Sequence, residues 1–219
     1  MRRSDKLLSR VGGSSPFLSK EAIRKIPWSE ELADEIQDAL ESPDVLDQKF
    51  ALFFAETLFH PDVLDAAHEA RFVSRMTTLL DCGSDPVKPY ALRLLVRFHA
   101  RVVDFRERVM KALGSEEAGV RHEALAGYEL CCKAKEVEPL ERFEHDPYYG
   151  EIAMGGPLRF DLRDEALSVI ERVLGVGFTR FQKVESLPGG RNVAFWSWEP
   201  YHRSKQPPWR KWFWNPFHR

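Results

Sequence analysis

The chain has 219 residues, of which 43 % are hydrophobic, and a formal net charge of −2. This is enough apolar material for the core of one large domain or of one short repeat array. Three cysteines, two of them adjacent, exclude a disulfide framework and favour free thiols in a reducing compartment. The charged N-terminus excludes a secretory signal, and the lack of an uncharged apolar window of about eighteen residues excludes a membrane span. The cytoplasm is the expected location.

The charge is distributed unevenly along the chain. Residues 1–26 and residues 191–219 each carry a net charge of +5, so residues 27–190 carry −12. Five of the six tryptophans lie at or after position 196. The chain is therefore an acidic body between two basic ends, one of which is aromatic.

The N-terminal part predicts an arm followed by helices. Residues 1–18 contain Gly12-Gly13-Ser14-Ser15-Pro16 and predict a flexible arm. Apolar spacing predicts helices over 19–26 and 29–40, the second capped by Ser29. The next helix is expected to have Ser42 as its cap and Pro43 at its first position. It runs to about position 60 and points these apolar side chains inward: Leu46, Phe50, Phe53, Phe54 and Leu58.

Turns and amphipathic helices alternate up to position 174. A helix is predicted over 66–80, and Asp85 is expected to cap the next one, which has Pro86 at its first position. Two more helices follow, one after Arg101 and one that ends near the paired cysteines. Residues 143–160 are rich in helix breakers and aromatics and are interpreted as an inserted loop before a last helix over 161–174.

Beyond Gly175 the helical pattern fails. Residues 177–181 and 192–195 are candidate strands on either side of Pro188-Gly189-Gly190, which predicts a small hairpin. We therefore expect three parts: a flexible N-terminal arm (1–18), a helical repeat domain (19–175), and an irregular basic and aromatic C-terminal segment (176–219) that includes the hairpin.

A short pattern recurs four times within the helical region. The copies are Leu46-Asp47-x-x-Phe50-Ala51-Leu52, Val87-Lys88-x-x-Ala91-Leu92, Val120-Arg121-x-x-Ala124-Leu125 and Leu162-Arg163-x-x-Ala166-Leu167. The alanine recurs in steps of 40, 33 and 42 residues. A period in this range predicts stacked helical pairs, an architecture that usually binds other macromolecules.

At these residues the chain resembles the HEAT-repeat proteins, in particular the compact bacterial phycobilisome-lyase-like HEAT repeats. In that family the second helix of each pair follows Asp-Pro-x-x-Val-Arg-x-x-Ala-x-x-Ala-Leu or a close variant. The copies that contain Lys88, Arg121 and Arg163 match this pattern, whereas Asp47 stands where the family prefers a basic residue. The resemblance covers roughly residues 42–175. It implies an all-α fold, a short right-handed superhelix of about four helical pairs.

The resemblance also implies roles for the repeated residues. The alanine lets neighbouring helices approach closely. The basic residue is expected to meet the turn acid of an adjacent repeat, so Lys88, Arg121 and Arg163 are expected to form a ladder between layers. The family shares no catalytic residues, and its usual activity is protein binding on a concave surface that the second helices line.

Two groups of residues invite a catalytic or metal-binding interpretation, and both are disfavoured. His122 lies nine residues before Cys131, but no Cys-x-x-Cys or His-x-x-x-His spacing is present. Glu144-His145-Asp146 places acid and base in one loop with two tyrosines, a composition that is ordinary for a surface loop. We therefore predict no catalytic residue, no metal site and no cofactor.

Residues 195–219 interleave cations with aromatic rings, and three interpretations stay open. The favoured one is a cap that folds back on the acidic body, because the terminal layer of a repeat array needs cover. The second is contact with the headgroups of an anionic membrane. The third is nucleic-acid binding by stacking and phosphate contacts, which an acidic body opposes.

We predict a non-enzymatic function in protein binding, as an adaptor or scaffold whose second helices and 143–160 loop face a partner. The residues expected to contact that partner are Arg121, Glu123, Tyr148, Tyr149, Trp196, Trp198, Trp209, Arg210, Lys211, Trp212 and Trp214. The alternative is a HEAT-like enzyme. It is either a nucleic-acid glycosylase, which needs an acid and aromatics in a basic groove, or a lyase acting on a bound chromophore.

Overall fold

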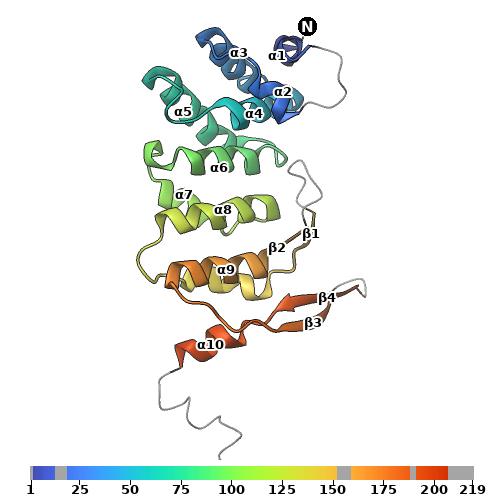
Figure 1. The fold of residues 1–219 in the computed structure, drawn as a ribbon, viewed down its shortest axis with the longest axis vertical. Helices are drawn as coiled ribbons and strands as arrows, with labels where there is room; N and C mark the ends of the chain where they lie inside the picture. Colours follow the sequence, from blue (N-terminus) through green and yellow to red (C-terminus); the bar gives the residue numbers. More distant parts are fainter. Residues whose placement is uncertain (1, 13–18, 152–158, 188–190, 207–219) are drawn as a thin grey trace, which may run out of the picture. The chain divides into compact units, whose positions relative to one another are not determined.

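The computed structural model describes residues 2–12, 19–151, 159–187 and 191–206 (Figure 1). These residues are mostly helical, which confirms the all-α prediction. The chain divides into two compact units, residues 1–130 (unit 1) and residues 131–219 (unit 2). The domain boundaries expected from the sequence stay a prediction. No helix in the described part of the chain has the length and hydropathy of a membrane span.

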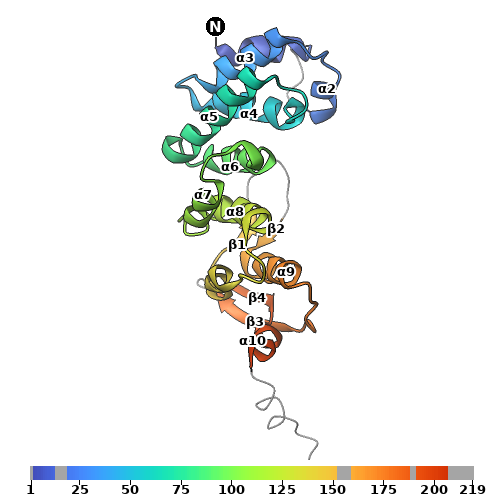
Figure 2. The same cartoon turned by 90° about the vertical axis from the view of Figure 1, so that its left-hand side faces the viewer.

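Unit 1 is built from helices joined by short connections (Figures 1 and 2). In chain order they are α1 (Arg3–Arg10), α2 (Lys20–Arg24), α3 (Glu30–Leu40), α4 (Val45–Leu58), α5 (Ala66–Cys82), α6 (Lys88–Arg97), the short 3-10 helix η1 (His99–Arg101), α7 (Phe105–Ala112) and α8 (Ala118–Cys131). α3 packs on α4 and α5 packs on α6, as expected for helical pairs, while α1 packs on both α3 and α4. The superhelix itself stays a prediction.

One predicted helix cap is confirmed and two are wrong. Ser29 caps α3, since its side chain accepts a hydrogen bond from the Leu32 amide at 3.1 Å. The hydroxyl of Ser42 instead donates to the Asp47 carboxylate, and Asp44 caps α4. The carboxylate of Asp85 pairs with the Lys88 ammonium at 3.2 Å, and α6 begins without a side-chain cap. Leu46, expected inward, is exposed.

A helix occupies much of the segment that was expected to be a flexible arm. Leu7 of α1 is fully buried. The carboxylate of Asp47 accepts hydrogen bonds from the backbone amides of Arg3 at 3.3 Å and Ser4 at 3.0 Å, at the start of α1. Those amides lack partners within the helix and prefer an anion. Asp47 stands where the repeat pattern prefers a basic residue because its carboxylate binds the start of α1.

Burial disfavours the ionised form of Asp47, but the hydrogen bonds that it accepts from Ser4, Ser42 and Arg3 outweigh this cost and lower its pKa. The carboxylate is therefore charged at neutral pH and fastens α1 to the start of α4.

The second helices of the pairs approach their neighbours closely. Ala51, Ala91 and Ala124, the recurring alanines of unit 1, are all fully buried. A Cβ atom added at Gly127 of α8 would lie 2.9 Å from the Val109 side chain of α7 and 3.1 Å from that of Val96 in α6. Figures 1 and 2 both show α6 and α8 as neighbours. Gly127 therefore stands where α8 meets α6 and α7, and the recurring alanines are buried in the core of unit 1.

The basic residue of the pattern meets the expected acid in one copy of unit 1. The Lys88 ammonium lies 3.6 Å from a carboxylate oxygen of Glu117, in the turn that precedes α8. Arg121 differs, because its guanidinium donates to the carbonyl oxygens of Ser115 and Glu116 at 2.9 and 2.8 Å. These contacts tie Arg121 to the turn before its own helix.

A row of alternating charges crosses α4, α6 and α8. The guanidinium of Arg93 lies 3.2 Å from the Glu56 carboxylate and 2.9 Å from the Glu123 carboxylate. The side chains of Glu56 and Glu123 are only 9 % and 6 % exposed. Lys20 and His122 add contacts at the two ends of the row, at 2.7 and 3.1 Å. The row therefore joins three second helices through partly buried ion pairs.

The ionised form of Glu123 is disfavoured by burial, yet its pKa is lowered because hydrogen bonds from His122 and Arg93 outweigh that effect. Glu123, expected to contact a partner, is thus committed to neighbours within the fold.

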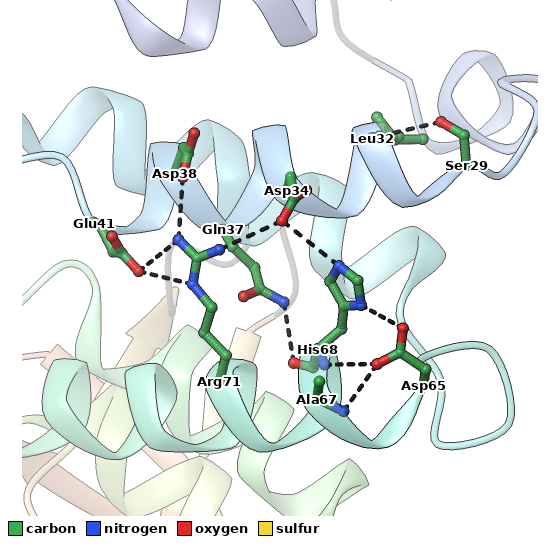
Figure 3. A network of polar contacts seen from close by, with 10 residues as sticks. All are labelled: Ser29, Leu32, Asp34, Gln37, Asp38, Glu41, Asp65, Ala67, His68 and Arg71. Atoms are coloured by element: carbon green, nitrogen blue, oxygen red, sulfur yellow. Dashed lines mark hydrogen bonds and ion pairs between the residues drawn. The ribbon is translucent and has the colours of Figure 1, made fainter.

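A second charge network lies in solvent on α3 and α5 (Figure 3). The Arg71 guanidinium of α5 reaches Asp34, Asp38 and Glu41 of α3 at 3.4, 3.1 and 2.9 Å. Its side chain is 40 % exposed, and those of the acids are more so. Ion pairs in such surroundings add little stability because water screens them.

Unit 2 combines helices with two short antiparallel ladders. Its elements are the 3-10 helix η2 (Glu138–His145), β1 (Tyr149–Glu151), β2 (Arg159–Asp161), α9 (Leu162–Leu174), β3 (Gln182–Leu187), β4 (Arg191–Trp196) and α10 (Glu199–Lys205). η2 and β4 both contact α9. β1 pairs with β2, and β3 pairs with β4 from Gln182 opposite Trp196 to Leu187 opposite Arg191.

Three expectations for unit 2 need correction. Residues 143–160, interpreted as a loop, include the end of η2 and the β1–β2 ladder. The hairpin is present, but its first strand spans 182–187 instead of 177–181, because hairpin strands pair most readily across a short connection. The segment that follows is not irregular up to position 205, since α10 forms there with Tyr201 fully buried.

Replacing Arg93 with methionine should destabilise the protein far more than replacing Arg71. Arg93→Met leaves two carboxylates poorly hydrated without their shared cation, at a cost of about 3–5 kcal/mol. Arg71→Met removes exposed pairs and should cost less than about 1 kcal/mol. Urea denaturation of both variants measures the difference, and equal losses would contradict a structural role for the buried row.

Candidate functional site

Unit 2 contains a cavity of about 650 Å³. Its walls come from the end of η2, the first turn of α9, the two strands of the hairpin, and α10. This volume falls within the range of sites that hold small ligands or a few side chains of a partner.

Arg163 joins three of these walls. Asp161 caps α9 by accepting the backbone amide of Arg163 at 2.9 Å, which fixes Arg163 in the first turn. The buried guanidinium donates to the carbonyl oxygen of Asp146 at 2.8 Å and to the carboxylate of Glu185 at 2.6 Å. It also lies 4.0 Å from the ring centroid of Phe195, a cation–π contact. The acid that Arg163 meets therefore belongs to β3, where the ladder prediction expected a repeat turn.

The hairpin presents one of its faces to the cavity. Lys183 lies opposite Phe195 and Glu185 lies opposite Val193, so these four residues share that face. Phe195 and Val193 are buried. The end of β4 is held by Asp164, whose carboxylate accepts the Trp196 amide at 2.8 Å. α9 thus positions both the buried arginine and the strand beside it.

α10 closes the cavity through an aromatic anchor. The ring of Tyr201 makes edge contacts with Phe178 and Trp198, with centroids 5.8 and 5.9 Å apart. Its hydroxyl donates to the Glu141 carboxylate of η2. Burial and this hydrogen bond raise the pKa of Tyr201 to about 12, so the phenol stays protonated. These contacts hold α10 against η2.

The acids that line the cavity are already paired. Glu185 binds Arg163, the carboxylate of Glu144 lies 2.8 Å from the His202 ring, and Glu199 binds Arg203. Within the described ranges, Lys183 and His145 form no ion pair or side-chain hydrogen bond, although both line the same cavity. The walls therefore carry an uncommitted cation at Lys183 and an uncommitted imidazole at His145. The buried indole N–H of Trp198 also has no hydrogen-bond partner among the described residues.

The structure brings some of the predicted contact residues to this cavity. Trp196 is half-buried on its wall, with the Arg180 guanidinium 5.6 Å from its ring centroid. Trp198 also lines it but is almost fully buried, which makes it part of the packing under α10. Arg121 and Glu123 belong to unit 1, with the partners given above. Outside the described residues lie Trp209, Arg210, Lys211, Trp212, Trp214 and the side chain of Tyr149.

The three loop residues Glu144, His145 and Asp146 do not face the same site. Glu144 and His145 line the cavity. Asp146 is buried and accepts the backbone amide of Tyr148 at 2.9 Å, which stabilises the local turn and leaves Tyr148 half-buried. The chemistry that this loop contributes to the cavity is thus one paired carboxylate and one imidazole.

Sequence reasoning missed four residues of the walls: Arg163 as a buried contact, Lys183, Glu185 and His202. The sequence does contain a signal for these residues. Charged residues alternate at positions 183 and 185, and apolar residues alternate at positions 193 and 195, which is typical of two paired strands with one face toward a packed surface. The misplaced first strand concealed this pattern.

No family model matches the chain, and no curated protein or solved structure is significantly similar to it. In the part of the chain that the structure describes, no three His, Cys, Asp or Glu residues are grouped so that they could hold a metal ion. The resemblance to HEAT repeats rests on the repeated residues named above.

Two acids at the start of α9 have raised pKa values. The second carboxylate oxygen of Asp161 is buried and has no hydrogen-bond partner among the described residues. Burial and the charge of Asp164 raise the pKa of Asp161 to about 7, and burial also raises the pKa of Asp164. The wall that carries Arg163 therefore contains a carboxyl group that titrates near neutral pH.

Asp161→Asn should remove a pH dependence of stability. Between about pH 4 and pH 7 the folded protein holds a proton on Asp161 that the unfolded chain releases, so the free energy of unfolding falls as pH rises. Asparagine also caps helices but cannot ionise. At pH 8 the free energy of unfolding of the variant should exceed that of wild type by about 1–2 kcal/mol, a value lowered to allow for the partial hydration of Asp161. Near pH 4.5 the two proteins should have similar stability.

Urea denaturation at several pH values measures this effect. Asp65→Asn is the matched control, because Asp65 also caps a helix but hydrogen bonds from His68 lower its pKa. That variant should lose stability relative to wild type above pH 4. Parallel pH profiles for wild type and Asp161→Asn between pH 5 and pH 8 would contradict a titrating carboxyl at this position.

Proposed function

We propose that this chain is a non-enzymatic protein-binding module, an adaptor or scaffold, and that the cavity in unit 2 seats a segment of its partner. The observation that carries the proposal is the charge state of the cavity walls. Each lining acid has a basic partner, whereas Lys183 and His145 are uncommitted within the described residues. A partner that brings a carboxylate would meet a cation there without facing an unpaired acid.

The apolar part of the walls suits a side chain of the same partner segment. Phe195 and Trp196 both line the cavity, and a volume of about 650 Å³ accommodates an aromatic or aliphatic side chain together with an acidic neighbour. Tryptophan and arginine are the residue types that most often dominate binding energy at protein interfaces. We therefore expect the partner segment to carry an apolar residue next to an Asp, a Glu or a C-terminal carboxylate.

The resemblance of the repeats to HEAT proteins supports a binding function for the chain as a whole. We assign the buried charge row of unit 1 to stability rather than to partner contact, because its members pair with one another. The membrane and nucleic-acid alternatives depend on the tryptophans and cations of residues 195–219, of which residues 207–219 lie outside the described residues. No contact described above favours an enzyme.

Affinity capture with the full chain as bait tests the proposal. Trp196→Ala removes apolar surface from the wall, and His145→Glu adds an acid where the partner carboxylate is expected. Trp28→Ala is the control, since Trp28 is a 40 % exposed tryptophan of unit 1. Once a captured partner is identified, its affinity should fall at least about tenfold with the first two variants and stay unchanged with the control.

Melting curves of all three variants separate binding from folding. His145 is exposed, so His145→Glu should leave the melting temperature unchanged and isolate the effect on binding even if Trp196→Ala is destabilised. Equal affinity of the partner for wild type, Trp196→Ala and His145→Glu would remove the cavity from the proposal.

A further inference from the structure

β3 is an unprotected edge of the two-stranded sheet in unit 2. The backbone of β4 packs on α9, and both views place β3 on the side of β4 that faces away from α9 (Figures 1 and 2). Residues 182–186 are all exposed, and Val184 is 70 % exposed. Apart from the ladder with β4, residues 182–187 make no backbone hydrogen bond with any described residue. The outer amide and carbonyl groups of β3 are therefore free to pair with another strand.

The sequence of this edge is complementary to itself. In an antiparallel pairing of two copies about Val184, Lys183 lies opposite Glu185 of the partner subunit, and Glu185 lies opposite Lys183 of the partner subunit. The two Val184 side chains face each other on the opposite face. Cross-strand pairs of opposite charge and of β-branched residues both stabilise antiparallel strands.

We propose that a second copy of this chain docks on β3, antiparallel and centred on Val184, so that the two hairpins form one four-stranded sheet. A two-fold axis through the valine pair makes the interface isologous, the commonest form of a symmetric dimer. The pairing covers the exposed valine and satisfies the outer backbone groups of both edges.

The charges select this register over its neighbours. Centring the antiparallel pair on Lys183 or on Glu185 places two like charges directly opposite each other, and a parallel in-register pairing does the same at both positions. Only the pairing about Val184 among these gives two opposite-charge pairs. Although Glu185 already accepts Arg163 with one oxygen, its side chain is 48 % exposed and can also receive the partner's Lys183.

The dimer proposal does not rest on the proposed function. Lys183 and Glu185 take part in both proposals, because they line the cavity and also lie on the pairing edge. Val184 lies on the opposite face of the hairpin and is not part of the cavity, so it belongs to the dimer proposal alone. The variants Trp196→Ala and His145→Glu test partner binding, and variants of Val184 test pairing of the edge. Either proposal can fail while the other stands.

Sedimentation velocity of the full chain over a range of concentrations tests the dimer. Wild type should shift from monomer to dimer as concentration rises. Val184→Lys places two like charges face to face and should stay monomeric throughout. Val103→Lys is the matched control, because Val103 is 77 % exposed in unit 1, and it should dimerise like wild type. Circular dichroism should show both variants folded, since each valine is exposed.

A charge exchange tests the register. Lys183→Glu alone sets acids against acids, and Glu185→Lys alone sets bases against bases, so each variant should be monomeric. An equimolar mixture of the two restores two opposite-charge pairs in a mixed dimer and should sediment as a dimer. Because mixing alone brings the dimer back, a folding defect cannot mimic this result.

Three outcomes would overturn the proposal: wild type that is monomeric at every concentration, a dimer that persists in Val184→Lys, or a mixture of the charge variants that stays monomeric.

Discussion

The close approach of successive second helices in unit 1 is the constraint on which the rest of that unit depends. Ala51, Ala91 and Ala124 are fully buried, and Gly127 has no room for a methyl group. Because the helices lie close together, the single guanidinium of Arg93 reaches carboxylates from the helices on both sides. A larger side chain at the alanines would separate the layers and leave those buried acids without a shared cation.

Much of the helical fold follows from local sequence. Apolar periodicity located α3, α5 and α8, because the face that a helix buries is encoded within the helix. α1 could not be found in this way, since the acceptor for its first amides is Asp47, more than forty residues along the chain. The caps at Ser42 and Asp85 failed for a local reason, because each side chain pairs with a charged residue a few positions later in the sequence, Asp47 or Lys88.

The residues of the candidate site could likewise be predicted only in part from the sequence. Composition drew attention to Trp196 and to the loop with Glu144 and His145, and these residues do meet at one cavity. The same criterion also selected Glu123, which is buried beside its partners Arg93 and His122, and Trp198, which is almost fully buried under α10. Residue type indicates what a side chain can bind, whereas only its neighbours in the fold determine whether that capacity is already used.

The most direct measurement is the free energy of unfolding of the full chain with leucine in place of the recurring alanines. If small residues set the spacing of the layers, Ala91→Leu and Ala124→Leu should each cost about 1–3 kcal/mol or more, because the added atoms overpack the contact. Ala100→Leu, at an exposed position of the same unit, should stay within about 0.5 kcal/mol of wild type. Three variants of equal stability would contradict the close packing of the layers.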